Sequence, residues 1–158
     1  MALAMISQHT ATGAAVGPVL EAKGSLVWSV APETLVIDAI RLMAGKGIGA
    51  LLVMNGDKPV GIVSERDYAR KVVLQGRSSK DTPVSEIMSS PVIFVTPSYT
   101  VDQCFYLMTE HRIRHLPVMD GERLAGVLSI GDLVRATVAA QRETIDQLTQ
   151  YILGNYPA

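Results

Sequence analysis

The chain has 158 residues, about the length of one domain, and 48% of them are hydrophobic, which predicts a sizeable core. Its net charge of -1 gives no electrostatic argument for nucleic acid, and no apolar run approaches the roughly 20 residues that cross a bilayer. We therefore expect neither nucleic acid nor a membrane as a partner. Because the single cysteine, Cys104, cannot form an internal disulfide, we also expect a cytoplasmic protein.

The first segment, residues 1–19, is rich in alanine, threonine and glycine, and we expect a mobile leader without the features of a secretory signal. A first unit follows at residues 20–79. Its apolar run SLVWSV predicts a strand, which Pro32 ends because proline cannot donate to a ladder. Apolar residues at helical spacing come next, and then two apolar runs joined at Asn55-Gly56, a pair favoured in hairpin turns.

The same order of elements returns at residues 80–140. The repeat is marked by pairs of identical residues, each 65 positions apart: Pro32 and Pro97, Gly61 and Gly126, Ser64 and Ser129, Asp67 and Asp132. Each unit reads strand, helix, strand, strand, helix, which predicts an α/β (α+β) fold made of two β-α-β-β-α repeats. Because a unit of about 50 residues buries too little surface alone, the repeats should pack against each other.

An amphipathic helix is expected at the end of the chain, in residues 141–158. Ile145, Leu148 and Ile152 share one face of it, and Gly154 is a helix-ending residue. This apolar stripe packs either on its own chain or on a second chain, and the sequence leaves both open.

The motifs of the two repeats resemble those of the cystathionine-β-synthase (CBS) domain family. Each repeat has V-x-P, a helix, a strand ending in V-M, an Asn-Gly or Asp-Gly turn, and then G-h-h-S-x-x-D, in which h is apolar. The run VSEIM before the second repeat resembles the family's lead-in, whereas the first repeat has VLEAKGS instead. The resemblance covers about residues 20–140 and identifies a tandem pair, or Bateman module, of the stand-alone signal-transduction type.

The resemblance implies two repeats packed as a pseudo-two-fold pair, a disc-like homodimer and a regulatory role without catalysis. It also implies adenosine compounds as ligands, bound in clefts between the repeats. AMP, ADP and ATP are the expected ligands, with NAD(H) as another and S-adenosylmethionine as a less favoured one.

The motif Ser-x-x-Asp at Ser64 to Asp67, and again at Ser129 to Asp132, has two interpretations. In the first it is a capping box, in which the serine and the acid satisfy backbone groups at a helix start. In the second, each carboxylate accepts hydrogen bonds from the 2′- and 3′-hydroxyls of a ribose, and the free N–H groups of the helix suit a phosphate. A serine can cap the helix and also contact a phosphate. Together with the resemblance, this predicts Asp67 and Asp132 as ribose-binding residues and the two serines as phosphate contacts.

The two repeats differ around these motifs, which predicts inequivalent sites. The first repeat has Arg66 where the second has Gly131. The second repeat places basic groups where the first has small residues: Arg112, Arg114 and His115 stand in place of Gly47, Gly49 and Ala50. The resemblance implies that the positions entering the second strand and opening the last helix face the cleft, so we expect Gly49, Ala50 and Ile113 to line it. We expect the basic groups to converge there on a di- or triphosphate. The alternative is that Arg66 and Arg114 are solvated surface charges and that His115 is satisfied locally.

Other chemistry finds little support in the sequence. His111 and His115 lie four apart, but no glutamate follows the first histidine, so no metal site is expected. Cys104 lies on the apolar face of a predicted helix and should be a small buried residue. No set of nucleophile, base and orienting group can be assembled, so no catalytic residue is assigned.

These features favour a regulatory protein that binds an adenine nucleotide and acts on a separate, unidentified effector protein. An alternative is an interaction module that binds no ligand and acts through its dimer surface and terminal helix. A small nucleotide-processing enzyme ranks last.

Overall fold

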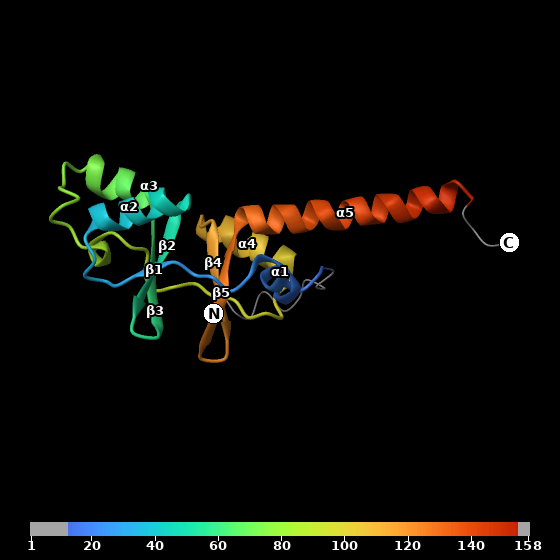
Figure 1. Ribbon diagram of the computed structural model, residues 1–158, viewed down its shortest axis with the longest axis horizontal. Helices are drawn as coiled ribbons and strands as arrows, with labels where there is room; N and C mark the ends of the chain where they lie inside the picture. The colour runs from blue at the N-terminus through green and yellow to red at the C-terminus, as the bar shows by residue number, and fades with distance from the viewer. Residues whose placement is uncertain (1–12, 155–158) are drawn as a thin grey trace. The chain divides into compact units, whose positions relative to one another are not determined.

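The computed structural model describes residues 13–154, and this part of the chain forms two compact units (Figure 1). The first unit contains residues 13–25, 95–118 and 127–154, and the second contains residues 26–94 and 119–126. The segment that precedes the first repeat therefore belongs to the same unit as the helices of the second repeat.

The second unit is built around a three-stranded sheet in the order β1-β2-β3. Strands β1 and β2 are parallel, β2 and β3 are antiparallel, and Gly56 with a φ of 61° forms the predicted turn between them. The elements are β1 (Ser29–Val30), α2 (Val36–Lys46), β2 (Ala50–Asn55), β3 (Lys58–Ser64), α3 (Glu65–Tyr68), a π-helical turn (Ala69–Val73) and a 3-10 turn (Val84–Glu86).

The first unit repeats this order with fewer strands. Strands β4 and β5 form the predicted hairpin, whose tip is grouped with the second unit. In place of the strand expected in VIFV, only Val95 makes a bridge, parallel to Val118. The elements are α1 (Val16–Lys23), α4 (Val101–His111), β4 (His115–Asp120), β5 (Arg123–Ser129) and α5 (Ile130–Ile152).

Each unit is completed by the segment that precedes the other repeat in the sequence. In the second unit the amide of Val84 donates to the carbonyl of Thr34 at 2.8 Å. In the first unit the amide of Val16 donates in the same way to the carbonyl of Tyr99, also at 2.8 Å. Val16 and Val84 are both fully buried. The boundaries expected from the sequence, 20–79 and 80–140, mark the repeats along the chain, whereas the compact units group segments by their packing, so each unit contains a lead-in from the other side of the repeat boundary.

Each unit has its own apolar core. Cys104 lies in that of the first unit, and burial raises the pKa of its thiol to about 11, as expected for a small packing residue. The core of the second unit contains Val36, Ala39, Met43, Leu51, Val53, Val63, Val72, Val84 and Ile87.

Two terminal elements differ from those expected. Residues 1–12 of the predicted leader lie outside the described residues, but α1 begins at Val16 because Val16 and Leu20 bury their side chains. The helix expected at residues 141–158 is the second half of α5, which runs unbroken from Ile130 to Ile152. Residues 155–158 lie outside the described part. Among residues 13–154, no helix is long and apolar enough to cross a membrane.

Candidate functional site

Both Ser-x-x-Asp motifs form complete capping boxes. Ser64 Oγ accepts from the amide of Asp67 at 3.2 Å, and Asp67 Oδ2 accepts from the amide of Ser64 at 2.9 Å. In the other motif the corresponding distances between Ser129 and Asp132 are 3.2 Å and 2.7 Å. Each box closes where a β-strand ends and a helix begins, so the chain fixes both carboxylates at equivalent positions. The capping interpretation is confirmed, and it leaves one carboxylate oxygen of each acid outside the box.

In the second unit the remaining oxygen of Asp67 faces a lysine. Lys71 Nζ lies 3.0 Å from Asp67 Oδ1 and donates to the carbonyl of Ile87 at 2.8 Å. The carboxylate is only 13% exposed, whereas the lysine side chain is 41% exposed. A long, half-exposed lysine contributes little through such an ion pair, so another donor can replace it at small cost.

In the first unit Asp132 is held by two basic side chains. Lys23 Nζ lies 2.6 Å from Asp132 Oδ2 and donates to the carbonyl of Val127 at 2.6 Å, while Arg135 donates to Asp132 Oδ1 at 2.7 Å. Burial alone raises the pKa of Asp132, but the hydrogen bonds from Lys23 and Ser129 outweigh it and lower the pKa to about 2. Asp132 is therefore a buried, ionised carboxylate, 8% exposed, with cations on both oxygens.

Lys23 is a site residue that the sequence analysis missed. It lies on α1, 109 residues before Asp132, in a segment that was assigned to the other repeat. No spacing rule links two residues so far apart. At the repeat offset of 65 residues Val84 corresponds to Val19, whereas the structure makes Val16 its equivalent, so the repeat gave no signal for this contact.

Around Asp67 the structure brings together the residues predicted in the first repeat. The amide of Glu65, which follows Ser64, donates to the carbonyl of Gly49 at 3.0 Å, and Ala50 pairs with Ser64 across β2 and β3. Arg66 is exposed at the start of α3 and makes no ion pair within residues 13–154.

The predicted residues of the second repeat gather around Asp132. The amide of Ile130 donates to the carbonyl of Arg114 at 2.8 Å. Burial lowers the pKa of His115, the charges of Lys23 and Arg114 lower it further, and only Asp132 opposes them. His115 is thus favoured in its neutral form. Ile113 is half-buried, and its place in a ligand cleft stays a prediction.

Gly131 and Arg114 show how the second motif differs from the first. A Cβ added at Gly131 would lie 3.4 Å from the guanidinium of Arg135, which is ordinary van der Waals contact, so this arginine lies over the first turn of α5 without requiring a glycine there. Arg114 is exposed and, among the described residues, makes no ion pair. Arg66 and Arg114 belong to different units, so their convergence on one phosphate chain stays a prediction.

Arg112 has the left-handed backbone, with a φ of 53°, that glycine adopts at the equivalent Gly47, where φ is 65°. Because this conformation strains a side chain with a Cβ, Arg112→Gly should stabilise the protein by about 0.5–1 kcal/mol. Thermal unfolding followed by circular dichroism measures the change. Arg114→Gly, at a neighbouring position without this backbone, is the control and should not stabilise. A melting temperature that falls in Arg112→Gly would contradict the strain.

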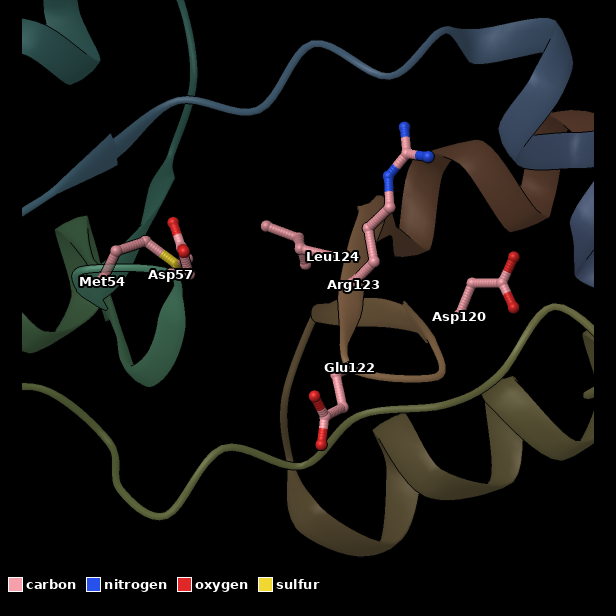
Figure 2. A pocket seen from close by; sticks show the side chains of 6 residues that line it. All are labelled: Met54, Asp57, Asp120, Glu122, Arg123 and Leu124. Atoms are coloured by element: carbon pink, nitrogen blue, oxygen red, sulfur yellow. The ribbon is translucent and has the colours of Figure 1, made fainter.

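A separate hollow of about 500 Å³ lies at the hairpin tips of the second unit (Figure 2). Its six lining residues are Met54, Asp57, Asp120, Glu122, Arg123 and Leu124. None of the residues predicted to bind a ligand lines it. Within the described part of the chain, no cluster of three or more His, Cys, Asp or Glu side chains can hold a metal ion, and His111 and His115 form none.

Both motifs thus have the same geometry, and comparison with known proteins likewise finds one domain that occurs twice. The model of the CBS domain matches residues 15–74 and 84–139. The chain belongs to the CBS-domain family. CBS domains generally bind adenosine-containing ligands, and CBS pairs are commonly regulatory ligand-binding modules.

Three relatives show how closely the CBS pair matches. A signal-transduction protein with CBS domains from Burkholderia ambifaria is 56% identical, with a TM-score of 0.78 over 81% of this chain and 96% of the other. The mitochondrial CBS domain-containing protein CBSX3 of Arabidopsis thaliana is 44% identical over 85% of this chain and 68% of its own length. A hexameric CBS-CP12 protein from bloom-forming cyanobacteria is 31% identical, with a TM-score of 0.68 over 77% of this chain and 69% of the other. The tandem CBS pair expected from the sequence is confirmed.

Proposed function

We propose that this protein binds an adenine nucleotide through Asp67 and Asp132 and passes its ligand state to a separate effector protein. The ligand acts by binding one arrangement of the protein more tightly than another, because only differential affinity shifts an equilibrium. The protein itself carries out no chemistry in this proposal. It works as a homodimer in the cytoplasm.

The observation that supports this proposal is the recurrence of one carboxylate geometry in both units. Each acid uses Oδ2 in its capping box, while Oδ1 contacts only a long basic side chain, Lys71 or Arg135. These side chains are 41% and 74% exposed, so they can move into solvent when another donor takes their place on the carboxylate. A ribose would then offer its two adjacent hydroxyls to an ionised acceptor that the fold already holds in place.

The charges near each motif favour a phosphorylated ligand. Arg66 stands beside Asp67 and Arg114 beside His115, and both arginines are exposed. Guanidinium groups suit phosphate oxygens, whereas S-adenosylmethionine carries a positive charge at its sulfonium. AMP, ADP and ATP are therefore favoured, followed by NAD(H).

Calorimetry with AMP, ADP, ATP, NAD⁺, NADH and S-adenosylmethionine tests the proposal, first on the native chain and then on Asp67→Asn and Asp132→Asn. Because a charge-assisted hydrogen bond contributes roughly 1.5–3 kcal/mol, each substitution should weaken binding at its own motif by about tenfold or more. Asp38→Asn, which removes an exposed acid on α2, is the matched control and should bind normally.

A 2′-deoxy analogue of the tightest ligand should lose affinity by a similar factor, because it lacks one of the two hydroxyls. Equal affinity for the deoxy analogue, or unchanged binding in both aspartate variants, would remove the ribose assignment. No binding by any of the six compounds would favour the second candidate, an interaction module that acts through its dimer surface and C-terminal helix. The exposed apolar residues of α5 are the observation that supports this second candidate.

A further inference from the structure

Helix α5 carries its apolar residues beyond the rest of the first unit. Its beginning packs against α1 and α4, and the helix then continues well past both of them (Figure 1). Every residue from Val138 to Ile152 is exposed. A helical segment of this length is marginal in water when it stands alone. The second half of α5 therefore needs another surface to remain helical.

The apolar residues of α5 follow the spacing of a two-stranded coiled coil. Alternate intervals of four and three residues separate the members of this seam, which are Val134, Val138, Gln141, Ile145, Leu148 and Ile152. The five apolar members are between 40% and 78% exposed. β-Branched residues occupy the a positions at Val138, Ile145 and Ile152, and Leu148 occupies a d position. In a parallel coiled coil this distribution of a and d residues favours two helices over three or four.

Gln141 decides which partner fits this seam. In an antiparallel pair a d residue faces an a residue, so Gln141 would face a valine or an isoleucine and leave its amide unsatisfied. In a parallel pair in register, Gln141 faces the partner's Gln141, and one amide donates while the other accepts. We propose that the seam of α5 binds α5 of a second copy of this chain, parallel and in register at Gln141.

The residues that flank the seam fit this arrangement. Thr137 and Thr144 donate to carbonyls of their own helix, Leu133 at 2.9 Å and Ala140 at 3.1 Å, so they need no partner to be satisfied. In a parallel pair Thr137 would lie beside Arg142 of the other helix, which brings no like charges together.

The size of the seam sets the expected strength of the pair. From Val134 to Ile152 the seam extends about 27 Å along the helix axis. A single pair of helices in contact over this length buries less surface than a standard interface, which buries about 800 Å² per partner. We therefore expect a dimer with a Kd in the micromolar range. The pairing rests on the homodimer of the proposed function, but it requires no nucleotide.

Sedimentation velocity of the full chain from about 1 to 200 µM, without nucleotide, tests the pairing. The native chain should shift from monomer to dimer, and Ile145→Lys should weaken this association at least tenfold. Gln150→Lys, on the opposite face of the same helix, is the control and should dimerise normally. A native chain that stays monomeric at every concentration would overturn the proposal, as would an Ile145→Lys variant that dimerises like the control.

Orientation is tested by Leu148→Cys under mild oxidation. A parallel pair in register brings the two new thiols together, so a disulfide-linked dimer should form readily, while Gln150→Cys should link far less. Equal linkage in both variants would exclude this register. Because neither experiment measures ligand binding, failure here leaves the nucleotide proposal standing, and failure of the nucleotide panel leaves this pairing standing.

Discussion

Asp132→Asn should lower the free energy of unfolding at pH 7 by about 2 kcal/mol. The carboxyl has a pKa of about 2 in the folded protein against 3.8 as its ordinary value, and one pKa unit corresponds to about 1.4 kcal/mol. Because the folded pKa is the lower one, this stability is present above pH 3.8 and is lost as the pH falls towards 2. Asparagine keeps the shape of the side chain but carries no charge for Lys23 and Arg135.

Urea unfolding followed by far-ultraviolet circular dichroism, at several pH values between 7 and 2, measures this difference. The native chain and Asp132→Asn should differ most near pH 7 and converge near pH 2. Asp38→Asn is the control, because its partner Arg41 and the acid itself are both well exposed and the pair contributes little. If the native chain and Asp132→Asn have equal free energies of unfolding at pH 7, or if their difference stays constant down to pH 2, the ionised carboxylate does not stabilise the fold.

The parts of the structure that the sequence predicted well depend on neighbouring residues. The turn at Gly56 and the capping boxes at Ser64 and Ser129 each follow from residues at most three positions apart. Such features need only local backbone preferences and hydrogen bonds within one turn. The repeat strengthened these predictions, because the same local pattern occurs twice at one spacing.

The parts that the sequence did not predict depend on contacts between distant segments. The contact from Lys23 to Asp132 spans 109 residues, and nothing in either neighbourhood indicates the other. The exchange of the lead-ins at Val16 and Val84 is of the same kind, because each of these residues is hydrogen-bonded to a residue of the other repeat, far away in the sequence. The continuity of α5 could have been seen, since no proline or glycine interrupts the chain between Asp132 and Gly154.

The contact between Lys23 and Asp132 also predicts how the second motif binds its ligand. Lys23 Nζ donates to Asp132 Oδ2 at 2.6 Å, and a ribose hydroxyl that uses this oxygen must displace the lysine. Lys23→Met keeps most of the aliphatic stem and removes the competing donor. In an Asp67→Asn background, where only the second motif remains, it should therefore strengthen adenosine binding by about tenfold, the value of one hydrogen bond.

Measuring the effect of Lys23→Met on the binding of both adenosine and ATP separates two roles of the lysine: its competition with a ribose hydroxyl for Asp132, and its attraction for phosphate. The positive charge of Lys23 attracts phosphate, so its removal should improve ATP binding less than adenosine binding. Lys46→Met removes a lysine that contacts Trp28 instead, and it controls for the change in net charge. Calorimetry of the variants with both ligands measures the effect. If Lys23→Met weakens adenosine binding, the lysine supports the site rather than competing for it. Stronger binding would show that the ligand displaces Lys23 of α1 from Asp132.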